Sequence, residues 1–237
     1  MNEKLAKQIL KENQKNYNLI AEEFSQTRNF ISNNFKNWIK NYIAEGEKIL
    51  DWGCGNGRFC ELFSNNNNYY GIDFSEKMIA IAQDKYPFGN FKTCLPTIIP
   101  YPNDFFDKIF SLAVFHHLPS KKIRIQFLKE AHRVLKPNGL LILTVWNMSF
   151  KQLIQSRNFK RLKLRLKFFF LKLIGKNPLD FNDIFIPWNN KCQRYIHCFT
   201  LKELEKLSKQ AGFKIIDKGV LKENQKESNL FIILQKI

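Results

Sequence analysis

The stretch that most constrains the fold is KILDWGCGNGRF, residues 48–59. Its apolar start, Ile49–Trp52, predicts a short buried strand. Gly53, Gly55 and Gly57 then alternate with other residues. Glycine is needed where the backbone turns with positive φ or lets a ligand come close. The spacing G-x-G-x-G differs from the G-x-G-x-x-G of dinucleotide-binding folds, so the stretch predicts only a strand, a glycine turn and a helix N-terminus that hold a nucleotide-like ligand.

Strand and helix patterns alternate after this stretch, which predicts a doubly wound, Rossmann-like α/β sheet. We expect strands over residues 49–52, 69–73, 91–94, 106–113 and 140–146, with helices over 56–63, from 75 onward and over 120–135. Ligands of such sheets bind at the carboxyl ends of the strands. The residues at those ends are Asp51–Gly57, Asp73, Cys94-Leu95, Ala113–His117 and Trp146-Asn147.

The rest of the chain predicts an N-terminal helical cap over residues 1–47, followed by one domain over residues 48–237. Residues 65–68 read as a polar loop. Thr200 begins a helix with a capping box, and residues 213–220 and 229–236 read as two strands around a polar turn, 222–228.

A basic insert at about residues 150–190 interrupts this pattern. Lys plus Arg exceed Asp plus Glu by 38 − 21 = 17, and residues 151–179 hold nine Lys or Arg and no acid. Five apolar residues fall on one face of a helix there: Phe159, Leu162, Leu166, Phe169 and Leu173. Three interpretations stay open: a clamp on an RNA backbone, an amphipathic helix over 157–174 that touches anionic lipid, or a solvated helix whose apolar face packs on the core.

Location and metal content follow from the termini and the cysteines. The polar start MNEKLAK predicts no signal peptide, and no window of about 18 apolar residues predicts a transmembrane helix. Five scattered cysteines without a CxxC pair predict reduced thiols and a cytoplasmic protein. Cys192, His197 and Cys198 lie close in sequence, but no second ligand pair exists, so we expect no metal.

Several short sequence motifs indicate a particular protein family as well as a fold. With Asp51 before its glycines, the first motif resembles that of the class I S-adenosylmethionine (SAM) methyltransferases, which have a seven-stranded sheet closed by an antiparallel hairpin. Over about residues 15–237 the chain resembles the tRNA wobble-uridine (carboxymethyluridine) methyltransferases. The matching words are YxxIAxxFSxTR at Tyr17–Arg28, AVxHH at Ala113–His117, Trp146, DxFxPW at Asp183–Trp188 and RYxHxF at Arg194–Phe199.

The resemblance implies SAM as cofactor and methylation of a carboxymethyl group on tRNA, at the anticodon loop, to its methyl ester. It implies cofactor-binding roles for Tyr17, Arg28, Asp51, Gly53, Gly55, Gly57, Asp73, Phe74, Leu95 and Ala113. It implies catalytic roles for Arg28, Asp183, Arg194 and His197, and substrate-binding roles for His117, Trp146, Trp188 and Tyr195. The eukaryotic relatives use a small zinc-binding activator subunit, so such a partner is a further expectation.

The chemistry fits these roles. A carboxylate is already ionised near pH 7 and needs no strong general base, whereas an arginine can hold one of its oxygens while the other attacks. Leu95 departs from the family, which usually has an acid there for the adenine amine. His116 and His117 are equally compatible with packing. Two other functions stay open: a small-molecule or lipid methyltransferase with a membrane-touching basic helix, and an RNA-binding module on a decayed fold.

Overall fold

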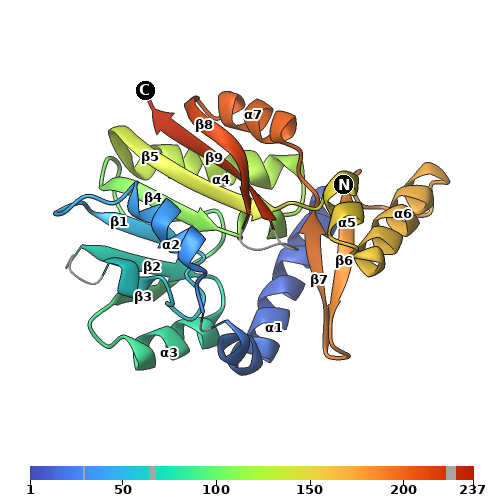
Figure 1. Ribbon diagram of the computed structural model, residues 1–237, viewed down its shortest axis with the longest axis horizontal. Helices are drawn as coiled ribbons and strands as arrows, with labels where there is room; N and C mark the ends of the chain where they lie inside the picture. The colour runs from blue at the N-terminus through green and yellow to red at the C-terminus, as the bar shows by residue number, and fades with distance from the viewer. Residues whose placement is uncertain (29, 64–67, 223–227) are drawn as a thin grey trace.

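The computed structural model describes residues 1–28, 30–63, 68–222 and 228–237. A seven-stranded sheet in the order β3-β2-β1-β4-β5-β9-β8 forms its centre (Figure 1). The strands are β1 Ile49–Trp52, β2 Tyr69–Asp73, β3 Asn90–Thr93, β4 Phe106–Leu112, β5 Leu135–Trp146, β8 Phe213–Lys222 and β9 Ser228–Lys236. The first five pair in parallel, and β9 runs antiparallel between β5 and β8. The predicted α/β sheet with its closing antiparallel hairpin is therefore confirmed.

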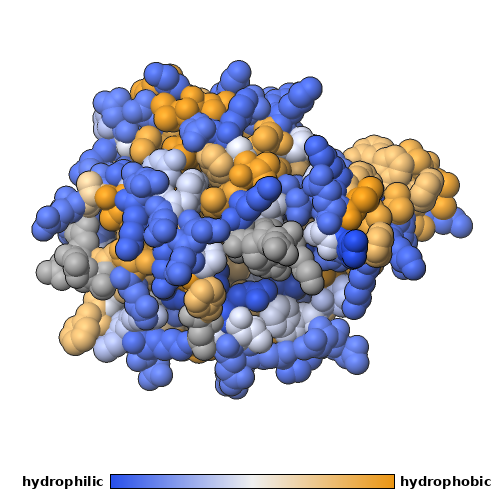
Figure 2. All heavy atoms as spheres, in the orientation of Figure 1, coloured by the Kyte–Doolittle hydropathy of each residue, from blue (hydrophilic) through white to orange (hydrophobic). Residues whose placement is uncertain are grey.

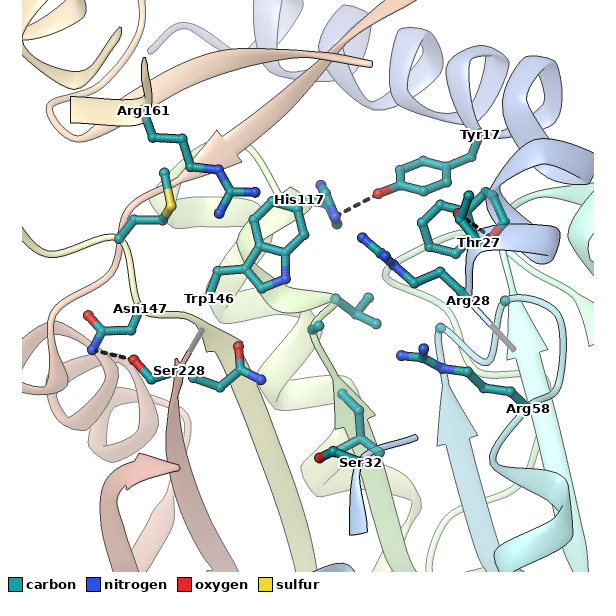
Figure 3. A pocket seen from close by; sticks show the side chains of 18 of the residues that line it. Tyr17, Thr27, Arg28, Ser32, Arg58, His117, Trp146, Asn147, Arg161 and Ser228 are labelled. Carbon is teal, nitrogen blue, oxygen red and sulfur yellow. Dashed lines mark hydrogen bonds between the residues drawn. The ribbon is translucent and has the colours of Figure 1, made fainter. Parts of the chain in front are cut away.

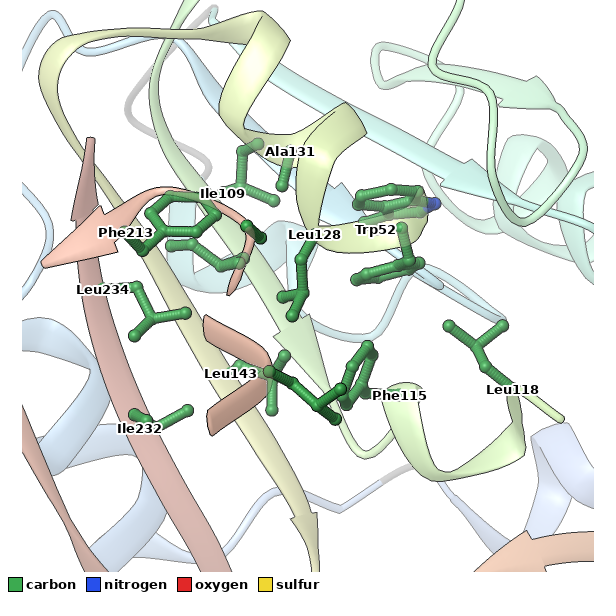
Figure 4. Close-up of a cluster of buried hydrophobic side chains, with 14 of the residues drawn as sticks. Trp52, Ile109, Phe115, Leu118, Leu128, Ala131, Leu143, Phe213, Ile232 and Leu234 are labelled. Carbon is green, nitrogen blue, oxygen red and sulfur yellow. The ribbon is translucent and has the colours of Figure 1, made fainter. Parts of the chain in front are cut away.

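Helices cover both faces of this sheet. One apolar cluster joins it to α4 (Lys121–Val134) and α7 (Leu201–Gln210); Figure 4 shows this cluster. The other joins it to α2 (Asn33–Lys40), η1 (Cys60–Phe63) and α3 (Glu76–Lys85). Alternate residues of β5 enter the two clusters, which explains why its sequence is continuously apolar.

Helix α1 (Glu3–Thr27) is continuous for 25 residues and begins at Asn2, whose side chain accepts a hydrogen bond from Leu5 N. Its buried residues recur every three or four positions, at Ala6, Ile9, Asn13, Tyr17, Ile20 and Ala21. It packs on α3 and on β7 (Cys192–His197). This packing places the C-terminal end of α1 at the carboxyl ends of the sheet strands.

A second, two-stranded sheet lies beside the main one. It pairs β6 (Asp183–Trp188) with β7 in antiparallel register, and α5 (Phe150–Gln155) and α6 (Phe159–Leu173) precede it. The basic insert does form a helix, as predicted. However, the predicted face of α6 does not pack on the core: four of its five apolar residues, Phe159, Leu166, Phe169 and Leu173, are exposed.

Three predictions at element level need correction or stand outside the structure. Residues 56–63 form turns and the short 3-10 helix η1, because Gly57 has a φ of +73° and prolongs the turn. Strand β5 begins at Leu135, so it includes the predicted stop around Asn138. The predicted loops at 65–68 and 222–228 fall largely on 64–67 and 223–227, outside the described residues. Among the described helices, none is both long and apolar enough to cross a membrane.

Candidate active site

A cavity of about 910 Å³ opens at the carboxyl ends of β1, β2, β4 and β5 (Figure 3). The glycine turn, the end of α1, and residues 146–161 between β5 and α6 form its walls. Its described lining holds one acid, Asp73, and five cations: Arg28, Arg58, Arg157, Lys160 and Arg161. A cavity of this size and charge can take a nucleoside cofactor together with an anionic substrate.

The glycine turn has the geometry that its sequence predicts. Gly53 and Gly55 have φ of +88° and +55°. A Cβ on Gly53 would lie 2.3 Å from Val114 Cγ2, so any larger residue would push into the loop after β4. The N–H of Gly55 donates to the Asp73 carboxylate at 2.9 Å. The turn is thus fixed to the end of β2 by its own backbone.

Asp73 fits the role of a ribose-hydroxyl acceptor. Its carboxylate accepts hydrogen bonds from Gly55 N and from Ser75 N (2.8 Å), and it lines the cavity. Burial raises the pKa of Asp73 to about 6, although these backbone bonds lower it. The carboxylate is therefore ionised at pH 7 and can accept hydroxyl donors from a ligand.

The structure does not bring Asp51, Gly57 and Leu95 to the cavity; Gly57 lies against Phe91 and Tyr86 instead. Asp51 lies beneath the glycine turn, where it accepts a hydrogen bond from the Tyr69 hydroxyl at 2.8 Å. Burial raises the pKa of Asp51 to about 7. Leu95 is 59% exposed and lies outside the lining. Of the other predicted cofactor residues, Tyr17, Arg28, Gly53, Gly55, Asp73, Phe74 and Ala113 do line the cavity.

Tyr17 and His117 form a hydrogen-bonded pair on the cavity wall (Figure 3). His117 Nδ1 lies 3.0 Å from the carbonyl of Tyr195, which can only accept, so Nδ1 carries the proton. His117 Nε2 then accepts from the Tyr17 hydroxyl at 2.8 Å. Burial and the charge of Arg194 lower the pKa of His117 to about 3, so the ring is neutral at physiological pH.

Arg194 lies between two indole rings, directly behind this wall. Its guanidinium carbon is 4.6 Å from the Trp188 ring centroid and 5.5 Å from that of Trp146. The side chain is close enough to Tyr17 to lower the pKa of its hydroxyl, which burial raises. The residue is 4% exposed, yet within the described structure Nε and Nη1 of Arg194 and Nε1 of Trp188 have no hydrogen-bond partner.

His116 is a second buried group without a partner among the described residues. It is 0% exposed, neither ring nitrogen has a hydrogen bond, and its ring centroid lies 4.8 Å from that of Trp146. Burial, with the charges of His117 and Arg194 after it, pushes its pKa well below the usual value. A neutral imidazole beside a guanidinium with two nitrogens unpartnered among the described residues makes a polar site next to aromatic rings.

Asp183, His197 and Tyr195 do not surround this site, in contrast to their predicted roles. His197 Nδ1 lies 2.6 Å from Asp183 and its Nε2 lies 2.8 Å from Glu203. Arg124 from α4 reaches Asp183 at 3.4 Å and donates to the Tyr195 hydroxyl at 2.9 Å. None of the five lines the cavity. These side chains therefore join the second sheet to α4 and α7.

Sequence reasoning missed two contributors. Arg124 falls on the same inward stripe of α4 as Leu128 and Ala131, and a cation on such a stripe was the available signal. Asn56, inside the glycine motif, donates from Nδ2 to the Ser25 hydroxyl at 3.1 Å and so ties the turn to α1. Trp146, by contrast, lines the cavity as predicted, with Arg161 5.3 Å above its ring.

Comparison with known proteins agrees with this geometry. Residues 50–143 match the family described as methyltransferase domain. A tRNA (carboxymethyluridine(34)-5-O)-methyltransferase of Schizosaccharomyces pombe is 26% identical over 238 residues, 88% of this chain and 91% of that protein. The enzyme of the same name from Arabidopsis thaliana is 35% identical over 136 residues, 55% of this chain but 31% of its own length.

Solved structures show the same fold. A SAM-dependent methyltransferase of Methanosarcina mazei superposes with a TM-score of 0.70 at 25% identity, covering 84% of this chain and 97% of that one. A Haloferax volcanii methyltransferase, solved with its activator Trm112, gives a TM-score of 0.67 at 13% identity, covering 94% and 97%. The chain therefore carries a methyltransferase domain with the fold of the class I SAM-dependent methyltransferases, and it resembles the tRNA carboxymethyluridine methyltransferases.

Proposed function

We propose that this enzyme methylates the carboxylate of a carboxymethyl group on the wobble uridine of tRNA, giving the methyl ester. The observation that carries the proposal is the buried guanidinium of Arg194, whose Nε and Nη1 have no partner among the described residues. Leaving such donors unpaired costs free energy, and an oxygen of a substrate carboxylate would satisfy one of them with a charge-assisted hydrogen bond. The names of the Schizosaccharomyces and Arabidopsis relatives support the same substrate.

SAM supplies a methyl group on a positively charged sulfur. In the proposed step one carboxylate oxygen would form the new O–C bond as the S–C bond breaks, and the electron pair of the S–C bond would stay on sulfur. No proton is removed, so the site needs no general base. Arg194 would hold the other oxygen, and the neutral His117 and Tyr17 would not compete as acids. The chain's contribution is orientation and exclusion of water.

The base would be held by aromatic rings. Recognition of single-stranded RNA uses unstacked bases on aromatic side chains, and Trp146 and Trp188, which flank Arg194, are the rings that would stack on the base. Since Arg194 is almost fully enclosed, one of the two indoles must move when substrate enters. The five cations of the cavity lining would face the phosphates of the anticodon loop. We include a small zinc-binding activator subunit as a proposed partner, because the family resemblance implies one and the Haloferax neighbour was solved with the Trm112 methyltransferase activator.

The test is mass spectrometry of nucleosides from carboxymethyluridine-containing tRNA incubated with the enzyme and SAM, with and without an activator. We expect the methyl ester to form. Arg194→Gln removes a charge-assisted bond worth about 1.5–3 kcal/mol, so kcat/KM should fall roughly 10- to 100-fold. Binding of SAM, measured by calorimetry, should stay unchanged. Methylation of small carboxylic acids but not of tRNA would overturn the proposal.

A further inference from the structure

Helix α6 packs Leu162 and Phe168 inward, but it also turns a second apolar face to solvent. Its inward side includes a cation: Arg165 is 8% exposed, and its guanidinium bonds to the carbonyl of Met148 and, at 3.1 Å, to Asn182 Oδ1. Its outward side exposes aromatic and aliphatic residues, with Phe170 59% and Leu173 58% exposed. A soluble helix normally turns its apolar side to the core, so this orientation indicates an apolar environment outside the protein.

The exposed residues form one surface. We define the α6 apolar face as Leu166, Phe169, Phe170, Leu173, Ile174 and Phe181, all exposed. The first five recur at helical spacing, and Phe181 joins them because its ring centroid lies 6.4 Å from that of Phe169. Helix α6 projects from the body of the molecule (Figure 1), and its apolar residues gather at the outer end of that projection (Figure 2).

Cations surround this face. Residues 151–179 hold nine Lys or Arg and no acid. Lys163 and Lys167 are exposed on the helix itself, and Lys172 Nζ lies 5.8 Å from the Phe181 ring centroid. The occupant of the α6 apolar face must therefore be apolar where it meets the phenylalanines and anionic around them.

We propose that the α6 apolar face inserts into the interface of a membrane that contains anionic lipid. Phe and Leu on one side of a helix with Lys beside them are the composition of interfacial helices, and each Lys or Arg near an anionic surface adds to the attraction. A second copy of this chain is disfavoured, because it would bring two such basic segments together. RNA would pair with the lysines but would leave Leu173 and Ile174 without a contact that satisfies them.

This inference goes beyond the proposed function and does not depend on it. Only the N-terminal end of α6, Phe159–Arg161, lines the cavity, whereas the α6 apolar face belongs to its C-terminal half and to Phe181. A membrane-bound enzyme would therefore keep its cavity wall intact. Methyl transfer and vesicle binding can be measured separately on the same variants.

The test is flotation of the full chain with vesicles of phosphatidylcholine alone or mixed with phosphatidylserine. We expect flotation only with phosphatidylserine, and its loss as salt rises. Phe170→Ser with Leu173→Ser should weaken vesicle binding at least about tenfold, since it removes two large apolar groups that contact lipid. The control is Phe88→Ser, which removes a phenylalanine that is 98% exposed and does not belong to the α6 apolar face, and it should leave binding unchanged.

Two outcomes would overturn the proposal. The first is no flotation with either vesicle. The second is equal vesicle binding by the wild type and the double variant. In that second case, loss of binding to bulk tRNA by the double variant in a gel shift would assign the face to RNA, and loss of self-association in light scattering would assign it to a second copy.

Discussion

Asp183→Asn tests whether the buried charges behind the second sheet are structural or catalytic. The side chain of Asp183 is fully buried, and it contacts Arg124 at 3.4 Å and His197 at 2.6 Å. The substitution keeps the shape of the side chain and removes its charge. Arg124 and His197 would then share a single carboxylate, that of Glu203, which lies 3.8 Å from Arg124 and 2.8 Å from His197.

The expected loss is large because a charge left unpaired in the interior cannot recover its hydration. Breaking a buried ion pair by removing one partner costs about 3–5 kcal/mol, and we expect about 3 kcal/mol because Glu203 remains. For a chain of this size 1 kcal/mol moves Tm by about 2–4 °C, which predicts a fall of about 6–12 °C. Burial alone would raise the pKa of Glu203, but His197 and Arg124 hold it below its usual value, so Glu203 stays ionised.

Urea and thermal unfolding provide the assay, and methyl transfer is measured at a temperature where both proteins are folded. The control is Asp84→Asn, an exposed acid on α3, which should change stability by less than about 0.5 kcal/mol. A double-mutant cycle with Arg124→Met adds a second check. The double variant should lose less stability than the sum of the two single variants, because the methionine leaves no charge to be stranded.

One result would refute this reasoning. If Asp183→Asn unfolds at the same urea concentration and temperature as the wild type but no longer transfers methyl groups, Asp183 acts in the chemistry. The role that the family resemblance implies would then hold, despite the position of Asp183 outside the cavity.

Three further predictions concern the cavity. Gly53→Ala should lose about 1–3 kcal/mol of stability in urea unfolding and most SAM binding, since residue 53 has a φ of +88° and a Cβ there would clash with Val114. Gly46→Ala is the control, because residue 46 has a φ of +80° but open space around a Cβ, and it should cost less stability. Equal losses of stability would rule out the clash with Val114 as the cause. SAM affinity, measured by calorimetry, should fall as pH drops through about 6, because protonated Asp73 no longer accepts hydrogen bonds from hydroxyl groups of the ligand; an affinity that does not depend on pH would contradict this. Because the pKa of Asp73 is higher in the folded protein than its usual value of 3.8, ionised Asp73 destabilises the ligand-free protein. This destabilisation is complete above about pH 6 and is relieved toward pH 4. Tyr17→Phe should cost about 1–3 kcal/mol in thermal unfolding, because it leaves His117 Nε2 buried without a donor; a gain in stability would show that the pair is strained.

The sheet was predictable from the sequence because its signals are local. Apolar runs of strand length and turn residues lie next to one another in the chain, and Ile49–Trp52 with its glycines needs no distant partner to be recognised. The helix expected over 56–63 did not form, since Gly57 adopts positive φ and delays the helical turn. A Cβ at Gly57 would lie 3.0 Å from Phe91 and from Tyr86, and the spacing of glycines does not encode such contacts with distant residues.

The site was less predictable because its contacts join distant segments. Arg124 contacts Asp183, which lies 59 positions later in the sequence, and the sequence pattern around neither residue predicts this contact. Periodicity likewise identified the apolar stripe of α6 but not the direction in which it points. The direction in which the stripe points depends on which side of the helix contacts the rest of the protein, and here the side of Arg165 does so, through hydrogen bonds to Met148 and Asn182.

In the β6–β7 hairpin, however, the alternation of side chains along a strand predicts which residues share a face. Neighbouring residues on a strand point to opposite faces of the sheet. Arg194 therefore faces Trp146 and Trp188, whereas the next residue, Tyr195, faces Arg124. Substitutions at these two adjacent residues should therefore affect different quantities, kcat/KM for Arg194 and the free energy of unfolding for Tyr195. Arg194→Gln should lower kcat/KM with little loss of stability, since two guanidinium nitrogens have no partner in the part of the chain that the structure describes. Tyr195→Phe should cost about 1–3 kcal/mol in urea unfolding with kcat/KM preserved. If both variants lost kcat/KM alone, or both lost stability alone, one face of the hairpin would not serve substrate binding while the other serves stability. The assignment of Arg194 to the substrate carboxylate would then be wrong.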